Sequence, residues 1–513
     1  MSDARITSSG VPDTTGTLQL VVSLANSGRL DEATVVARSL PDSSMSREAW
    51  SLIAAANANL QRFGAALDAI GCALDQDQNS RSLRLQRALL LERAGRAAES
   101  LDALDRLARE ADDSPGLLVH LARALHHAGR SAEAQARIDA GLTRWPIDVG
   151  LLRQSAELAW AAGAGADCVE RIERAIAEHP AELQLRLVAA DILRAAGDAA
   201  RGLALVEEAA RRAPGVPAFE TSMGVLLGEL GRAREALPWL RSAIARLPQS
   251  VQMRRNLLPV LLRAGEHREA LALAEALLPT APDDQQLIAY LAAAMRLTDD
   301  ARYPQLQDYP RLVRSYRPEA PAGFTNMAQF NAALARELGE LHGGAQRPLS
   351  QSIRSGTQTG RNLPADEAGY PVIAAFLAML AAPIDDYVAR LGAAPEHPTD
   401  RRRRERWRIA GSWSVRLQPG GFHTNHVHPQ GWISSAYYVE LPSNKGDSAE
   451  PDPRAGWLKF GDLAPAVAAA TAEHYVEPAA GMLVLFPSFF WHGTVPFTRG
   501  DRRLTAAFDV IPE

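Results

Sequence analysis

The sequence is poor in several features that define particular protein classes, and each shortage excludes a class. Only two cysteines, Cys72 and Cys168, occur in 513 residues, which excludes a disulfide framework or a cysteine-built zinc cluster. Aromatic residues make up 6%, and the formal net charge is −5, so no general basic field favours nucleic acid. The longest apolar run, 372–384, is too short to span a bilayer and contains a proline.

The remaining composition is that of a globular protein, with 47% hydrophobic and 22% charged residues. The first residues lack a basic start followed by an apolar core, so we expect a cytoplasmic protein with no membrane or nucleic-acid partner. The length predicts about three domain equivalents or two unequal parts. We expect a flexible N-terminus at 1–14, helical repeats at 15–298, a linker at 299–320 and a second domain at 321–513.

A 34-residue period runs through the first three-fifths of the chain. Glycines recur at this spacing, and a small residue follows each glycine by five positions. The glycines are Gly95, Gly129, Gly163, Gly197, Gly231 and Gly265, and the small residues are Ser100, Ala134, Cys168, Gly202, Ala236 and Ala270. Glycine at the end of one helix and a small residue within the next predict a closely packed helix pair in each period. Such pairs must stack to bury their apolar faces.

This pattern resembles the tetratricopeptide repeat family, with about eight repeats. A solenoid of this kind offers its inner face to an extended peptide, and the first helix of each pair lines that face. The register places four candidate substrate-binding residues there: Arg123, Arg153, Trp160 and Arg194. Because arginine outnumbers acid at the lining positions, a groove for an acidic peptide and a mixed, solvated groove are both open.

The composition changes after residue 300. Prolines interrupt 302–324, and short β-type segments separated by Gly/Pro-rich turns begin at Trp407. Many short strands with no helices between them predict a sandwich or barrel. The run Arg401–Arg404 looks like a basic patch, and a solvated loop is the simpler interpretation because no aromatic or lysine residues accompany it.

Histidines concentrate in this second part. His426 and His428 enter a strand two positions apart, so both rings can face one point. His492 follows a later strand and can return as a third ligand to the same metal. Arg503 and Thr505 begin the last strand on one face, and such a pair is suited to hold a carboxylate.

These segments resemble the Fe(II)/2-oxoglutarate-dependent oxygenase superfamily over about residues 320–513. The resemblance rests on FHTNHVHPQGWISSAYYVELP, FPSFFWH and RLTAAFDV, together with the upstream GTQT-x-x-NLP stretch. A more distant similarity to aspartyl/asparaginyl β-hydroxylase is visible in PGGFHTNH, FPSFFWH and RLTAAFDV. The expected fold is therefore α+β multidomain: an all-α tetratricopeptide-repeat solenoid followed by a double-stranded β-helix (jelly-roll) oxygenase domain.

The resemblance implies a set of cofactors and roles. Fe(II), 2-oxoglutarate and O2 are expected, with His426 and His492 as metal ligands. The distal carboxylate of 2-oxoglutarate is expected on Arg503 and Thr505, and Ser435 and Tyr437 are further candidates to touch it. Tyr437 is equally well explained by core packing. The loop Ser443–Gly456 is a candidate lid or a plain hairpin loop.

His428 departs from the superfamily's His-x-Asp/Glu…His pattern, because it stands where a carboxylate is usual. It is a third neutral ligand, or it lies beside a two-histidine site, or the site has lost oxygenase chemistry. We favour the first.

The leading functional hypothesis is a dioxygenase that hydroxylates a peptide or protein presented by the repeats. The alternatives are a small-molecule hydroxylase with repeats for assembly, a three-histidine dioxygenase without 2-oxoglutarate, and a non-catalytic adaptor with a relic barrel.

Overall fold

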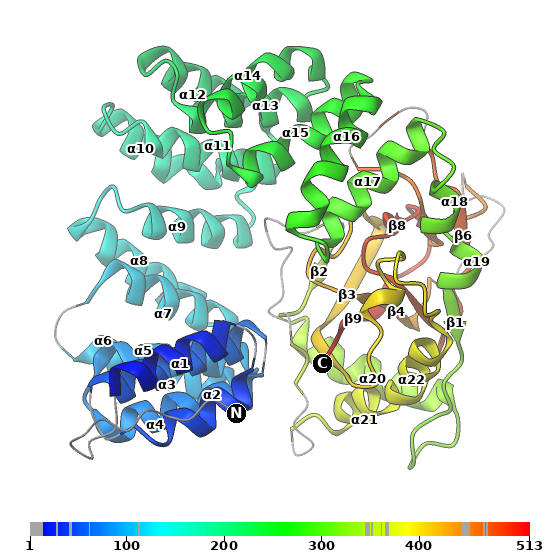
Figure 1. The fold of residues 1–513 in the computed structure, drawn as a ribbon, viewed down its shortest axis with the longest axis horizontal. Coiled ribbons are helices and arrows are strands. Elements are labelled where there is room, and N and C mark those ends of the chain that lie inside the picture. The colour runs from blue at the N-terminus through cyan, green and yellow to red at the C-terminus, as the bar shows by residue number, and fades with distance from the viewer. Residues whose placement is uncertain are drawn as a thin grey trace. The chain divides into compact units, whose positions relative to one another are not determined.

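The structure is a computed structural model of the whole chain. It describes residues 14–513 except 27–28, 41–43, 61, 111–112, 344–348, 350–351, 361, 365–368, 443–451, 465–466 and 468–469. Residues 1–13 of the predicted flexible N-terminus lie outside the described residues. Helices fill the N-terminal part and antiparallel strands dominate the C-terminal part (Figure 1). The chain divides into two compact units, residues 1–154 and 155–513.

The helices follow one another as antiparallel pairs in each unit. The first unit contains α1 (Thr14–Asn26), α2 (Leu30–Ala37), α3 (Ser44–Asn59), α4 (Phe63–Gln76), α5 (Arg81–Arg93), α6 (Ala97–Arg109), α7 (Pro115–His127), α8 (Ser131–Arg144) and the start of α9 (Val149–Ala161). The second begins with α10 (Glu170–Glu178), α11 (Gln184–Ala196), α12 (Ala199–Arg212), α13 (Pro217–Glu229), α14 (Ala233–Arg246), α15 (Val251–Ala264), α16 (His267–Leu277) and α17 (Gln285–Leu297).

The predicted glycine frame is confirmed by the backbone. All six glycines of the 34-residue period have positive φ angles, between 76° and 95°. Each lies where the first helix of a pair has ended, and glycine adopts this conformation at little energetic cost. The 34-residue period in the sequence therefore marks the end of the first helix in each pair.

The small residues of the frame lie where two helices of a pair approach closely. A Cβ added to Gly202 would lie 3.0 Å from the carbonyl oxygen of Ala190 on the preceding helix. The equivalent Ser100 is buried and donates a hydrogen bond to Ala88 O at 2.8 Å. Cys168 is buried in the same slot, as predicted for a small hydrophobic residue.

The segment predicted as a linker is part of the folded core, which corrects that expectation. It forms α18 (Tyr303–Leu306), α19 (Tyr309–Leu312) and β1 (Arg314–Tyr316). Strand β1 pairs with a strand near the C-terminus, Arg314 opposite Leu485. Tyr309 and Leu312 are buried. The prolines of this segment begin short helical turns rather than mark a free connector.

Two antiparallel sheets build the C-terminal part. Its strands are β2 (Ile353–Gln358), β3 (Trp407–His423), β4 (Ile433–Glu440), β5 (Leu458–Phe460), β6 (His474–Val476), β7 (Leu483–Pro487), β8 (His492–Thr494) and β9 (Arg503–Pro512). The larger sheet has the order β1-β7-β4-β9-β3-β2, and the smaller has the order β6-β5-β8. Phe460 of the small sheet contacts Phe486 of the large one, with ring centres 5.0 Å apart. This arrangement agrees with the predicted fold class.

Helices α20 (Met327–Leu341), α21 (Pro371–Met379) and α22 (Ala381–Arg390) accompany the large sheet. Tyr437 of β4 donates a hydrogen bond to Asn331 of α20 and contacts Phe376 of α21. The stretch Pro371–Arg390 is long and apolar enough to cross a membrane by length and composition. Ile373, Phe376 and Ile384 within it are completely buried in the protein core.

The last repeat helix and the sheets share one hydrophobic core within the second unit. Leu287, Ile288 and Ala289 of α17 belong to the same buried cluster as Phe490 and Trp491 beside β8. The boundary predicted at residue 298 therefore does not separate two independent cores.

Candidate metal centre

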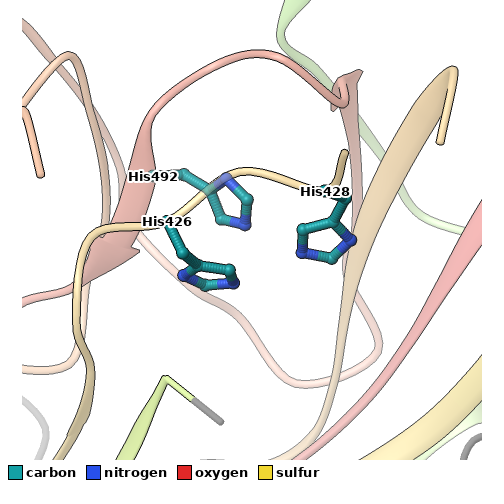
Figure 2. Close-up of side chains that lie close together, drawn as sticks. All are labelled: His426, His428 and His492. Carbon is teal, nitrogen blue, oxygen red and sulfur yellow. The ribbon is translucent and has the colours of Figure 1, made fainter. Parts of the chain in front are cut away.

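Three histidines converge at the junction of the two sheets. His426 and His428 follow β3, and His492 opens β8. A backbone bridge joins the two segments, because His426 N donates to His492 O at 2.9 Å and His492 N donates to His426 O at 3.1 Å. One ligand atom from each ring lies within 4.8 Å of those of the other two. Figure 2 shows the three rings turned toward one another, as the sequence predicts.

Hydrogen bonds orient all three rings in the same sense. Nδ1 of His426 donates to Thr424 O at 2.8 Å, and Nδ1 of His492 donates to Phe490 O at 2.8 Å. A carbonyl oxygen only accepts, so each of these Nδ1 atoms carries the proton. Nδ1 of His428 lies 2.5 Å from Oδ1 of Asp509, which is also an acceptor. Each ring therefore turns Nδ1 to an oxygen acceptor, which leaves Nε2 as the atom that can face a metal.

Burial keeps the rings of His426 and His492 neutral. Desolvation lowers the pKa of His426 to about 3, and the neighbouring His428 contributes to the shift. Desolvation also holds the pKa of His492 well below its ordinary value, with His426 adding to the effect. Neutral imidazole is the form that binds a metal ion, so the site needs no proton release from these two rings near neutral pH.

Asp509 is a functional candidate that the sequence analysis missed. Its carboxylate accepts from His428 and from the hydroxyl of Ser434 at 2.7 Å, and Ser434 is in turn 2.8 Å from the hydroxyl of Ser488. Asp509 and Ser434 lie opposite each other on β9 and β4. The Asp509 carboxylate thus contacts the side of the His428 ring that faces away from the candidate metal position. Period-two alternation from Arg503 along β9 would have placed Asp509 on this inner face.

Arg503 is buried next to this site, and its Nε donor is unused. Its side chain is 3% exposed, and its Nη1 donates to the hydroxyl of Thr494 at 2.9 Å. Its Nε has no hydrogen-bond partner among the described residues, and no carboxylate of that part of the chain pairs with it. The ring of Tyr438 lies 5.2 Å from the guanidinium carbon. A buried guanidinium without an ion pair favours an anionic partner, and a carboxylate fits it by shape and charge.

The neighbouring Arg502 is different. It is about half exposed and pairs with Glu440 at 2.8 Å. Of the two arginines, only Arg503 is therefore available to a ligand of the inner face. Thr494 on β8 accepts the hydrogen bond from the Arg503 guanidinium, and the sequence analysis did not single this residue out.

Thr505 shares the inner face of β9 with Arg503, and its hydroxyl lies 3.4 Å from the carbonyl oxygen of Val415. Ser435 and Tyr437 do not share this face, which corrects their assignment to the cosubstrate. Ser435 bonds to both backbone groups of Phe508, and Tyr437 reaches α20. Ser435 and Tyr437 lie an odd number of residues from His428, whereas Ser434 and Tyr438 lie an even number from it. Ser434 and Tyr438 are the residues of β4 that face the site.

The candidate substrate residues on the repeats are partly engaged elsewhere. Arg123 donates two hydrogen bonds to Glu92 of the preceding repeat, at 3.0 and 2.8 Å. Arg194 pairs with Glu229 of the next repeat at 3.0 Å and with Asp191 at 3.1 Å. These pairs favour the mixed groove over the acidic-peptide groove, because the arginine charges are already balanced.

Arg153 and Trp160 lie on α9 and are partly exposed. Residues 443–451 of the candidate lid, Ser443–Gly456, lie outside the described residues.

Comparisons with known proteins concern parts of the chain. Residues 411–509 match the family model described as "Putative 2OG-Fe(II) oxygenase". No curated protein matches the chain in sequence. A tetratricopeptide repeat protein from Parabacteroides merdae is 15% identical over 48% of this chain and 98% of its own, with a TM-score of 0.32.

Two further solved structures are similar to parts of the chain. A prolyl-4-hydroxylase from Pseudomonas putida is 20% identical over 40% of this chain and 96% of its own, with a TM-score of 0.26. A tetratricopeptide repeat protein from Thermus thermophilus is 24% identical over 42% of this chain and 100% of its own, also with a TM-score of 0.26.

Proposed function

We propose that the protein is an Fe(II)- and 2-oxoglutarate-dependent dioxygenase that hydroxylates a polypeptide side chain. One observation carries the proposal: three imidazoles with free Nε2 atoms converge beside a buried arginine that has no acidic partner in the described chain. The match of residues 411–509 to the oxygenase family supports the same function.

The residues present fit the implied cofactors. His426, His428 and His492 would hold the metal through Nε2, and the neutral state of His426 and His492 suits that role. Arg503 would receive the distal carboxylate of 2-oxoglutarate, with Thr494 fixing the guanidinium and Thr505 beside it. When bound, iron with 2-oxoglutarate supplies the oxidation of a C–H bond by O2, coupled to formation of succinate and CO2.

This chain's own contribution is orientation and charge. Thr424 and Phe490 fix two rings by their carbonyl oxygens, and Asp509 fixes the third. The Asp509 carboxylate also places a negative charge near the site, in part replacing the carboxylate ligand that His428 displaces. The buried surroundings of His492 and Arg503 exclude water, which strengthens both the metal site and the carboxylate contact.

The two arginines that begin β9 provide a matched test. Replacing Arg503 with Lys keeps the charge but loses the planar fork, so 2-oxoglutarate affinity should fall about tenfold or more. Arg502→Lys alters an exposed ion pair and should leave that affinity unchanged. Calorimetric titration of 2-oxoglutarate into the Fe(II)-loaded protein under argon measures both. If Arg502→Lys weakens binding and Arg503→Lys does not, the assigned carboxylate site is wrong.

The polypeptide substrate is supported by the repeats that precede the oxygenase domain. A segment held on the repeats has a raised effective concentration at the metal, so the site itself can bind it weakly. We expect peptide hydroxylation, detected as one added oxygen by mass spectrometry in a defined peptide library, to fall in Trp160→Ala. Succinate formed without substrate should not change in that variant.

Two outcomes would redirect this assignment. Hydroxylation of a small molecule at equal efficiency by wild type and Trp160→Ala would favour a small-molecule enzyme with repeats for assembly. Absence of succinate from the iron-loaded wild type under all substrates would favour a non-catalytic adaptor.

A further inference from the structure

The last repeat helix, α17, is bonded to the residue that precedes the metal-site histidine of β8. The indole N–H of Trp491 donates to the carbonyl oxygen of Ala289 at 3.2 Å, although 202 positions separate them in the chain. The ring of Tyr290 lies 5.8 Å from that of Trp491. Trp491 is only 5% exposed, so this hydrogen bond is made in a water-poor interior where an unpaired indole N–H is unfavourable.

A second connection from α17 reaches the same tryptophan through its backbone. Arg296 donates to Gly461 O at 2.7 Å and to Thr471 O at 2.9 Å, and its Nε lies 3.1 Å from Glu473. Gly461 N donates to the carbonyl oxygen of Trp491 at 2.9 Å. One helix therefore fixes both the side chain and the backbone of Trp491.

From Trp491 the constraint passes to the histidine ring. His492 is the next residue, and its Nδ1 donates to the carbonyl oxygen of Phe490, the residue on the other side of Trp491. A rotation of the chain at Trp491 would move both the donor ring and its acceptor. The direction of the His492 Nε2 lone pair thus depends on how Trp491 is held.

The other ligand-bearing segment also contacts this helix. The backbone N–H of Gln285, the first residue of α17, donates to Pro429 O at 3.4 Å. Pro429 directly follows His428. Both segments that carry the candidate ligands are consequently tied to one repeat helix.

We propose that α17 positions the metal centre through two residues, Arg296 on the helix itself and Trp491 beside β8. This rests on the proposed function of the three histidines as iron ligands. The solenoid's last helix is part of the site's support. A histidine held by a rigid surrounding structure binds metal more tightly than one whose orientation varies.

The competing interpretation is that α17 only stabilises the fold, and Trp432 supplies the control that separates the two. Its indole N–H donates to Thr399 O at 2.9 Å, and the side chain is completely buried. Trp432→Phe therefore removes the same volume and the same type of hydrogen bond as Trp491→Phe. The acceptor of the Trp432 hydrogen bond lies on the segment before β3 and not on α17.

The experiment titrates Co(II) alone into the full-length protein and follows its visible absorption, which reports both affinity and ligand geometry. We expect Trp491→Phe to weaken Co(II) binding about tenfold and to shift the absorption band. Trp432→Phe should keep the wild-type affinity and band, at a similar loss of stability in urea. Arg296→Lys should weaken binding in the same direction, because a lysine cannot hold both carbonyl oxygens, and it replaces Trp491→Phe if that variant does not fold.

The remaining outcomes overturn the proposal. Wild-type affinity in both Trp491→Phe and Arg296→Lys would show that α17 does not position the site. Equal weakening in Trp432→Phe and Trp491→Phe would show that general destabilisation is responsible. A wild-type protein that binds no Co(II) or Fe(II) would instead overturn the metal centre itself, and with it this inference.

Discussion

The repeat region and the sheet region of this chain are held together by contacts of different range. In the repeats, partners lie about one period apart: Arg201 and Asp167 are separated by 34 residues and Arg194 and Glu229 by 35. In the sheets, Arg314 pairs with Leu485 and Val415 pairs with Thr505. Local contacts can be formed by each repeat with its neighbour, whereas the sheets require the whole C-terminal part at once.

The two regions also use charge differently. The repeats carry exposed ion pairs such as Arg96–Glu99 and Arg232–Glu235, whose side chains are about half exposed. Such pairs contribute little to stability. The repeats also bury Arg186 and Glu220, each hydrogen-bonded to a neighbouring side chain, and the sheet region buries His492, Arg503 and Asp509. Buried polar groups are costly unless they are partnered, so the sheet region concentrates the groups that need a ligand. The following predictions test this contrast, from the largest effect to the smallest.

His492→Ala should have the largest effect on the sheet region while leaving the repeats unchanged. Loss of one of three ligands should abolish stoichiometric Fe(II) binding, since even the residues behind ligands are worth about 10–100-fold in affinity. Helix content should stay at the wild-type value, because the repeats do not depend on this ring. Metal analysis after gel filtration and far-ultraviolet circular dichroism measure the two. Unchanged iron occupancy would remove the metal centre from consideration.

Asp509→Asn should act on the metal without removing a ligand. The variant keeps the size of the side chain but loses its charge, so Fe(II) affinity should fall about 10–100-fold. Asp462→Asn is the control, because its carboxylate pairs with Lys459 and not with a histidine. Titration of Fe(II) against a chelator of known affinity compares them. Equal affinities in the two variants would show that the Asp509 charge does not act on the site.

Gly224→Ala should act only on the repeats. The added Cβ would lie 2.4 Å from Leu240 Cγ and 3.2 Å from Ala236 O, so unfolding free energy should fall by about 1–3 kcal/mol. At Gly71 of α4 the added Cβ meets nothing within 4 Å, so Gly71→Ala should raise stability by up to about 1 kcal/mol. Urea unfolding followed by circular dichroism gives both values. Equal effects would contradict the assignment of Gly224 to a close helix contact.

Acid should weaken the sheet region through His342. Burial, with Arg416 and Arg502 nearby, lowers the pKa of His342 to about 4 from its ordinary 6.5. Between pH 6.5 and 4 the unfolded chain therefore binds a proton that the folded chain does not. Stability is fully present above pH 6.5 and falls on acidification by up to about 1.4 kcal/mol per pH unit from this group.

The pH effect can be measured in the metal-free protein by urea unfolding at pH 7.5 and 5.0. His342→Gln should reduce the difference between the two pH values by about 1–2 kcal/mol. His342 is bonded to Ser414 and Thr357, so the variant also loses stability at pH 7.5. The variants are therefore compared by how steeply the free energy of unfolding changes with pH, and not by its value at one pH. An unchanged slope would show that His342 does not contribute to the acid sensitivity.

The contrast in range explains what the sequence predicts. The glycine period was visible because each repeat fixes its own helix stop, and the structure has all six glycines at positive φ. The convergence of His426, His428 and His492 was also predictable, from the two-residue spacing of the first two and from family resemblance, although His426 and His428 follow β3 rather than lie within a strand. The inner face of β4 was assigned wrongly, because Ser435 and Tyr437 were chosen where the pairing with β9 places Ser434 and Tyr438. Strand β1 was missed because three residues carry no pattern of their own and gain their conformation from β7.

The order of the large sheet has a consequence for how the protein is made. The last strand, β9, lies between β4 and β3, and the early strand β1 pairs with β7. During synthesis the repeats can fold as they leave the ribosome, while the sheet stays open until the final residues appear. For most of that time α17 presents an uncovered apolar side that β8 and its preceding turn will later occupy. A chaperone that binds nascent chains would find its target there until Phe490 and Trp491 are made.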